Sequence, residues 1–558
     1  MSDSTLEYSD PPPGEAGAAG KVKASAGAWF SLIAVALGIM VVQIDGTVVA
    51  AANPKIASDL NATPGQIQWV TTGYLLALSG LLIPAGTVAD KIGRKKAFLI
   101  GVGGFSLASL LCGMSGSIEM LIGARVLQAV FASLLGPSGL AVLKASFPPA
   151  KLPAALGIFG AVTAVAMAGG PMLGGVLVEY ANWSWVFYIN LPFGIIGVLV
   201  GLIVIKESAQ RGSEPLDIPG AIALTAAMVS AVWGITGAQD DGWASGKTLG
   251  FIGLGAVLLA VFVLIEARTE HPMVALSLFK DRSVSVGLLL MVVTMLAFFA
   301  IVFYLMFYLQ GVQGKSAIMA AVSLLPLTAV FTVASPLAGW ATGKLGVKGT
   351  LLLGAVLLFG ALVYLRQIEV DTSGWALAPP LVLSGFGAGF LLVAGIQAIV
   401  GNAPVEKAGV ASGMQQSMQQ LGGTLGIAIF GSLLASSVSS RFPDALRDEF
   451  AGKGGSAVDV MADNNGVHES VALGFPPSAR DAVKEQLVQG GGMRADDLNS
   501  FVDTLTRVAH QTFVDGMHLV FTISAGLTVV VGLLSLLVRN VKPQQEESAA
   551  APEIGIHV

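Results

Sequence analysis

One short basic loop lies between two long apolar segments and reads Pro84-Ala85-Gly86-Thr87-Val88-Ala89-Asp90-Lys91-Ile92-Gly93-Arg94-Lys95-Lys96. Gly86 lets two helices approach closely, because a residue without a side chain adds no bulk at their contact. Asp90 can pair with the positive end of a helix. A cluster of basic residues is typical of loops on the cytoplasmic side of a membrane. The loop therefore predicts a membrane protein whose helices meet at its inner surface.

The composition of the chain agrees with this prediction. Of its 558 residues, 54% are hydrophobic and 12% are charged, and the mean hydropathy is +0.76. These values are too apolar for a soluble protein of this length. The single cysteine, Cys112, excludes a disulfide framework.

A helix needs about 20 apolar residues to cross a bilayer. Fourteen stretches of the sequence satisfy this, near residues 28–52, 67–89, 97–115, 118–143, 154–179, 185–205, 217–236, 248–266, 284–309, 317–343, 350–366, 376–401, 408–437 and 514–538. An even number of spans places both termini on the same side of the membrane. With the N-terminus inside, eighteen Lys and Arg residues lie on the cytoplasmic side, against Lys55, Lys247, Lys315 and Arg366 in short outer loops. This bias predicts that both termini are cytoplasmic.

The segments outside the spans have distinct compositions. Residues 1–27 are polar and lack the pattern of a signal peptide, so we expect a disordered cytoplasmic tail, and residues 539–558 form a second one. Residues 438–513 carry mixed charges and Gly-rich breaks and are expected outside the cell, with short helices at 477–488 and 494–509. This segment is interpreted either as a cap over the protein or as a solvated insertion.

An internal repeat predicts the domain organisation. The segment 84–95 is echoed by Leu337-Ala338-Gly339-Trp340-Ala341-Thr342-Gly343-Lys344-Leu345-Gly346-Val347-Lys348, in which Gly343 stands where Asp90 stands. The repeat indicates two related six-helix halves, residues 28–206 and 284–538, with a linker and two inserted helices between them at 207–283.

Several motifs resemble known families. The loop at 84–96 closely resembles the loop signature of the major facilitator superfamily. Five further segments resemble the fourteen-span drug:proton antiporter family within it, namely Asp45-Gly46-Thr47-Val48-Val49-Ala50-Ala51-Ala52-Asn53-Pro54, Trp69-Val70-Thr71-Thr72-Gly73-Tyr74-Leu75-Leu76, Leu121-x-x-x-Arg125-x-x-Gln128, Gly170-Pro171-Met172-Leu173-Gly174-Gly175 and Trp183-Ser184-Trp185-Val186-Phe187-Tyr188-Ile189-Asn190-Leu191-Pro192. The sequence departs from the family pattern at Ala50, Asn53, Ala129 and Ala166. The resemblance implies an all-α polytopic membrane protein with the major facilitator fold and fourteen transmembrane helices.

Charges deep inside the spans are candidates for proton coupling. Asp45 is the only acid, and Arg125 the only basic residue, that we place deep in a span. Such charges are costly in a bilayer and usually face a cavity. Burial raises the pKa of a carboxyl group and a neighbouring guanidinium lowers it, so a carboxyl between the two effects can bind and release a proton. We expect Asp45 to carry the proton, with Arg125 and Gln128 as its partners. The alternative is a static ion pair that only fixes helix packing.

Glycine-rich segments predict the residues that take part in gating or conformational change. We expect gating or conformational roles for Gly86, Asp90, Gly93 and Arg94 in the loop and for Gly170, Pro171, Gly174 and Gly175 in the fifth span. Small residues allow the facing half to slide close, and Pro171 bends its helix. Ordinary small-residue packing is the alternative interpretation.

Aromatic and amide side chains predict the substrate site. The candidates lie in the ninth, twelfth and thirteenth spans and are Phe299, Phe303, Tyr304, Phe307, Tyr308, Gln397, Gln416 and Gln420. Aromatic rings suit planar or greasy compounds and can support cations. An interfacial aromatic belt and polar packing between helices are the alternatives.

These features together predict a proton-coupled antiporter that exports hydrophobic or amphipathic drugs or antibiotics. Export of a lipid or an endogenous metabolite is the main alternative, and a non-transporting membrane sensor or scaffold is a third. No nucleotide-binding domain and no nucleophile–base set is apparent in the sequence, so we expect no enzyme activity. We also expect no metal and no cofactor, with the proton gradient as the energy source. The expected partners are the substrate, protons and membrane lipids, without nucleic acid, and the protein is expected to be a monomer in a bacterial cell membrane.

Overall fold

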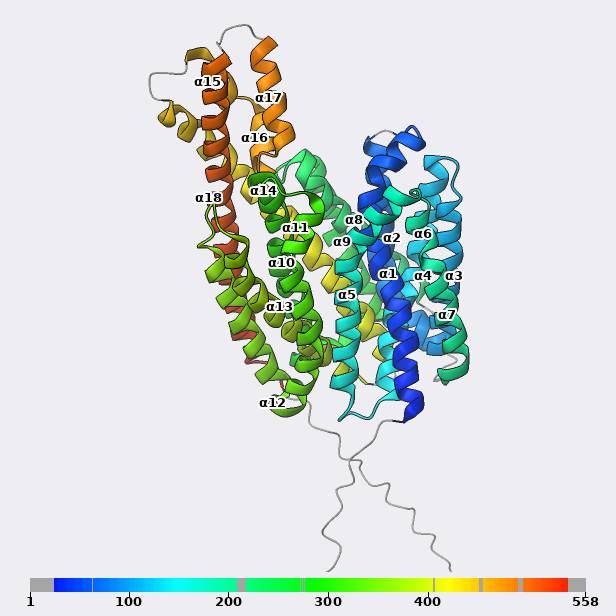
Figure 1. The fold of residues 1–558 in the computed structure, drawn as a ribbon. Helices are drawn as coiled ribbons and strands as arrows, with labels where there is room; N and C mark the ends of the chain where they lie inside the picture. The colour runs from blue at the N-terminus through cyan, green and yellow to red at the C-terminus, as the bar shows by residue number, and fades with distance from the viewer. Residues whose placement is uncertain are drawn as a thin grey trace, which may run out of the picture.

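The chain forms a bundle of long helices, seen in a computed structural model that describes residues 25–62, 64–207, 217–270, 272, 274, 276–404, 407–450, 455–489 and 495–539 (Figure 1). Within these residues all regular structure is helical. Twelve helices there are long and apolar enough to cross a membrane. The chain is therefore an all-α, multi-pass membrane protein. The predicted tails fall almost wholly outside the described residues.

The helices form two groups that lie side by side in Figure 1. The first group comprises α1 (Ala26–Asp59), α2 (Pro64–Ile92), α3 (Arg94–Gly113), α4 (Ile118–Ser146), α5 (Leu152–Tyr180), α6 (Trp185–Tyr188) and α7 (Asn190–Val204). The second comprises α10 (Arg282–Phe307), η2 (Tyr308–Val312), α11 (Ala317–Ser323), α12 (Leu325–Leu365), α13 (Gly374–Ile396), η3 (Gln397–Gly401), α14 (Ala408–Glu449) and α18 (Ala495–Ser535). The inserted helices α8 (Ile218–Asp241) and α9 (Gly246–Arg268) pack on each other, and α8 contacts both groups through α2 and α14. The short helix η1 (Leu276–Lys280) leads into α10.

The two ends of the bundle differ. Helix α1 begins and α18 ends at one end, which we call the inner face (Figure 1). The opposite end, the outer face, carries α15 (Gly455–Ala462), α16 (Asn465–Ala472) and α17 (Pro477–Gln489). Both described chain ends thus lie on one face, with the predicted outer segment on the other. That the inner face is cytoplasmic stays a prediction.

The count of fourteen spans also stays a prediction. Two of the predicted spans, 317–343 and 350–366, lie in α11 and α12, and α12 is one 41-residue helix with non-helical backbone at Gly346. The predicted span 154–179 lies within α5, of which Leu152–Thr163 qualifies as a shorter apolar helix.

The repeat has a structural counterpart at its glycines. Gly93 has a φ of 103° between α2 and α3, and Gly346 has a φ of 75° inside α12. Because side chains disfavour this left-handed region, glycine allows the chain to break its helix at the same place in both copies.

The outer segment is a packed helical unit. Helix α14 continues to Glu449, and α18 begins at Ala495, so the predicted short helix at 494–509 and the last span form one helix. No glycine or proline separates them in the sequence, which explains this difference. Phe442, Phe475 and Phe501 are buried in this unit.

We predict that Gly346→Ala lowers the apparent thermal stability of the purified protein. An alanine held at a φ of 75° costs about 1–2 kcal/mol. Gly343→Ala is the matched control, since a Cβ there meets nothing within 4 Å and alanine favours a helix. Equal unfolding temperatures for the two variants would contradict the prediction.

Candidate functional site

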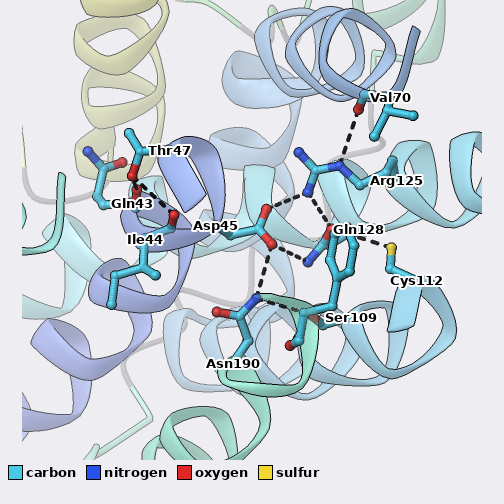
Figure 2. A network of polar contacts seen from close by, with 11 residues as sticks. Gln43, Ile44, Asp45, Thr47, Val70, Ser109, Cys112, Arg125, Gln128 and Asn190 are labelled. Atoms are coloured by element: carbon cyan, nitrogen blue, oxygen red, sulfur yellow. Dashed lines mark hydrogen bonds and ion pairs between the residues drawn. The ribbon is translucent and has the colours of Figure 1, made fainter. Parts of the chain in front are cut away.

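An ion pair buried among the first group of helices forms the centre of the site. Asp45, from the interior of α1, has 0% of its side chain exposed, and Arg125, from α4, has 1%. The Nη1 atom of Arg125 donates a hydrogen bond to Oδ2 of Asp45 at 2.5 Å (Figure 2). The two charges predicted from the sequence therefore meet.

Gln128 completes the predicted trio. Its Nε2 donates to Oδ1 of Asp45 at 2.9 Å, and its Oε1 accepts from Nη1 of Arg125 at 2.7 Å. Cys112 also donates from Sγ to the same Oε1 at 3.7 Å. Arg125 and Gln128 are three residues apart on α4 and so share one helix face. The amide thereby bridges both members of the ion pair.

The guanidinium of Arg125 is held from two more sides. Its Nε donates to the backbone carbonyl of Val70 in α2 at 3.2 Å. Its Cζ lies 4.1 Å from the centre of the Tyr74 ring, an arrangement typical of a cation–π contact. Helices α1, α2 and α4 are thus joined at this charge.

Asn190 also belongs to the site, although the sequence alone predicts no role for it. Its Nδ2 donates to Oδ1 of Asp45 at 3.0 Å and to Oγ of Ser109 at 3.0 Å (Figure 2). Ser109, from α3, donates in turn to the backbone carbonyl of Phe187 at 2.9 Å. The signal in the sequence is the polar amide next to Leu191-Pro192, within the motif at 183–192 that resembles the family pattern.

The local sequence explains how Asn190 reaches the ion pair. The helix is interrupted at Ile189, between the four-residue α6 and α7, which begins at Asn190. Pro192 lies in the first turn of α7, where the missing N–H leaves no hydrogen bond unmade. This restart places the amide at a helix beginning, with Asp45 opposite.

The two groups of helices meet at the inner face through glycines. A Cβ on Gly86 of α2 would collide with the carbonyl of Gly409 in α14, and a Cβ on Gly409 would collide with that of Gly86. Asp90 accepts hydrogen bonds from the backbone N–H groups of Gly409 at 2.9 Å and Val410 at 3.2 Å. Arg94 also donates to Asp90 at 3.3 Å. The loop at 84–96 thus caps the N-terminus of α14, and the pairing of Asp90 with a helix N-terminus matches the expectation.

A lysine caps the neighbouring helix end. The Nζ atom of Lys144, at the inner end of α4, donates to the carbonyls of Val400, Gly401 and Ala403. These carbonyls end η3, where a positive charge is favoured. An acid and a base of the first group therefore hold the two ends of the η3–α14 connection.

The second glycine contact is uncharged. A Cβ on Gly339 of α12 would collide with the carbonyl of Pro153 in α5, and one on Gly157 would lie 2.5 Å from that of Ser335. In the repeat Gly339 corresponds to Gly86, and Gly343 replaces Asp90. Pro153, at the start of α5, has no N–H that an acid could bind.

The glycines of α5 that are predicted to act as a gate do not face the second group of helices where their contacts are described. Gly170 packs against Thr47 of α1, within its own group of helices, while a Cβ on Gly175 would meet nothing within 4 Å. Gly174 is buried, and the side chain of Pro171 lies outside the described residues. The contact of Gly170 thus lies within its own group of helices, and the gating role of Gly170, Pro171, Gly174 and Gly175 stays a prediction.

The aromatic residues predicted to bind substrate have two different kinds of surroundings. Phe303 and Phe307 are half-buried and touch edge to face with ring centres 4.8 Å apart, and Phe299 packs against Gly423 of α14. Tyr308 is fully buried, and its hydroxyl donates to the carbonyl of Glu369 at 2.7 Å, so it anchors an outer loop.

The remaining substrate candidates are scattered. Tyr304 is buried, and among the described residues its hydroxyl has no hydrogen-bond partner. Gln416 is half-buried and lies against Gly136 of α4, which places it between the two groups. Gln397 is buried in η3, and Gln420 is half-buried on α14. The structure therefore does not gather all eight predicted residues in one place.

Comparison with known proteins gives a consistent result. The family described as "Major Facilitator Superfamily" matches residues 35–427. The chain is 37% identical to the tetracenomycin C resistance and export protein of Streptomyces glaucescens over 94% of this chain and 93% of that protein. It is 32% identical to the multidrug resistance protein Stp of Mycobacterium tuberculosis over 74% of this chain and 76% of that protein. In fold it is similar to the human organic anion transporter MFSD10 (TETRAN), with a TM-score of 0.57 and 13% identity over 91% of this chain and 98% of that chain.

We predict that Asp90→Asn loosens the inner face. Loss of a carboxylate from a helix N-terminus costs about 1 kcal/mol, so a cysteine replacing the buried Val410 should react with a maleimide about fivefold faster. Asp217→Asn is the matched control, because Asp217 caps only its own helix, through the N–H of Gly220 at 2.9 Å. The same labelling rate in both variants would contradict a role of Asp90 in closing this face.

Proposed function

The chain belongs to the major facilitator superfamily, and on that premise we propose that it is a proton-coupled antiporter that exports hydrophobic or amphipathic drugs or antibiotics. Two relatives are described as a resistance and export protein and as a multidrug resistance protein, which supports this substrate class. The observation that carries the proton coupling is the ion pair between Asp45 and Arg125, removed from water inside the helices.

The proposed cycle uses the two groups of helices as rocking halves. The first half is residues 28–206 and the second 284–538, with the inserted helices in 207–283. In this structure the inner face is held together by the contacts of Gly86, Asp90 and Lys144. Protonation of Asp45 from outside favours the return to an inward-facing state, and the drug favours the outward-facing one.

The membrane supplies the energy in this proposal. One elementary charge moved across about 100 mV gains about 2.3 kcal/mol. At equilibrium this supports a concentration ratio of about fifty for each charge. No cofactor and no enzymatic step is needed, and the proposed partners are the substrate, protons and lipids around a monomer. We place both termini in the cytoplasm of a bacterial cell.

We predict that drug addition drives proton movement in liposomes containing the wild-type protein, and that Asp45→Asn abolishes it. An asparagine keeps the shape of Asp45 but cannot carry a proton. Flux that survives the substitution would move the proton site to Glu119, in the first turn of α4, or to Glu179, in the last turn of α5. An absence of flux with a broad panel of amphipathic compounds would favour a lipid or an endogenous metabolite as substrate, or a protein that does not transport.

We predict that Phe303→Ala raises the half-maximal drug concentration for transport about fivefold, because one aromatic contact contributes about 1 kcal/mol to binding. Tyr308→Phe is the control, since its hydroxyl serves an outer loop. A half-maximal concentration unchanged by Phe303→Ala would remove this residue from the substrate site.

A further inference from the structure

The two oxygens of Asp45 have different surroundings. Oδ2 lies 2.5 Å from the guanidinium of Arg125, which disfavours a proton on this oxygen. Oδ1 accepts from two neutral amides, those of Gln128 at 2.9 Å and Asn190 at 3.0 Å. A proton that arrives at Asp45 therefore binds Oδ1, and the new O–H group needs an acceptor in place of one donor.

The amide of Gln128 cannot become this acceptor without loss. Its Oε1 already accepts from Arg125 at 2.7 Å and from Cys112 at 3.7 Å. A half-turn of the amide would bring its NH2 group against the guanidinium, and two donors would then face each other. Gln128 is thus fixed as a donor to Asp45.

The amide of Asn190 is less constrained than that of Gln128. Its Nδ2 makes both of its hydrogen bonds, to Asp45 and Ser109, and within the described chain no donor lies on its Oδ1 (Figure 2). A half-turn about its last side-chain bond brings this oxygen to Oδ1 of Asp45. Ser109 keeps its own hydrogen bond to the carbonyl of Phe187.

We propose that Asn190 is a positioning residue of the proton cycle, whose amide donates to the ionised carboxylate of Asp45 and accepts from its protonated form after a half-turn. In this step a proton from water binds Oδ1 of Asp45. The Nδ2–H···Oδ1 hydrogen bond breaks, and an O–H···Oδ1 bond to Asn190 replaces it. The inference rests on the proposed proton coupling.

The position of Asn190 gives this turn a consequence for the fold. The residue begins α7 directly after the interruption at Ile189. Its hydrogen bond to Ser109 links it to α3, and Ser109 links onward to α6. A half-turn breaks the hydrogen bond between Asn190 and Ser109. The protonation state of Asp45 therefore changes the contacts at the junction of α6 and α7.

Few other groups can shift this equilibrium. The titratable groups that face Asp45 are Arg125 from α4, Tyr74 from α2 and Cys112 from α3. Tyr188 of α6 packs edge to face against Trp185 instead. Helix α7 contains no titratable residue, and those of α5 lie exposed at its outer end.

The test measures drug-driven proton flux from pH 5.5 to 8.5 in liposomes with the wild type, Asn190→Leu and Asn190→Asp. Leucine neither donates nor accepts, so the ionised form of Asp45 loses a charge-assisted hydrogen bond, and we expect the pH midpoint of flux to rise by about one unit. Asn190→Asp has the same shape but can no longer donate an N–H, and we expect a larger rise. Ser106→Ala, also on α3 and next to Gly194 of α7, is the control, with an unchanged midpoint.

Infrared difference spectra of the same samples follow the carboxyl of Asp45 directly, with Asp45→Asn to assign its band. The same titration midpoint in the wild type and both Asn190 variants would overturn the inference, whether or not flux occurs. A shifted titration in a protein without drug-driven flux would instead sink the transport proposal and support the inference on Asn190. Thermal unfolding of each variant identifies structural damage, and the titrations are compared only between variants that unfold at the wild-type temperature.

Discussion

The N-terminal helices are organised around the buried ion pair of Asp45 and Arg125. Removal of one member of a buried ion pair typically costs about 3–5 kcal/mol, because the other charge is left uncompensated. Asp45 and Arg125 each obtain additional hydrogen bonds, from the amides of Gln128 and Asn190 and to the carbonyl of Val70. Four separate segments of the chain must therefore hold their places for this pair to be tolerated.

At the inner face, the two groups of helices are joined by glycine contacts and by charges at helix ends. Helices of the two groups meet there at glycines, without side chains between them. At α2 and α14 the contact is reinforced by Asp90 on one helix terminus, with Lys144 on the neighbouring one. At α5 and α12 it relies on packing alone, since Pro153 and Gly343 have replaced the groups that a cap requires. The two copies of the internal repeat thus share a close glycine contact, and only the first has an acid, Asp90, on a helix N-terminus.

Residues that contrast with the apolar sequence around them could be identified as functional or structural candidates from the sequence alone. Asp45 and Arg125 were identifiable because charges are rare in membrane spans, and Gly93 and Gly346 because they recur at equivalent places. Asn190 was not, since a neutral amide in a span does not by itself reveal its partner. The partner of Asp90, 319 residues away, depends on how the halves pack. The short helix predicted at 494–509 and the span predicted at 514–538 are one helix, α18, because no glycine or proline separates them.

Helix α14 is continuous from the inner face to the packed unit on the outer face, with Pro443 near its outer end. It has 42 residues and therefore extends about 63 Å at 1.5 Å per residue. Its first turn is the one that Asp90 holds, and its last turn belongs to the packed unit on the outer face. A tilt of about 10° about the inner end displaces the far end by about 11 Å. A movement of less than a side chain's width at the glycine contact is thereby magnified into one that a pair of spectroscopic labels on the outside can register.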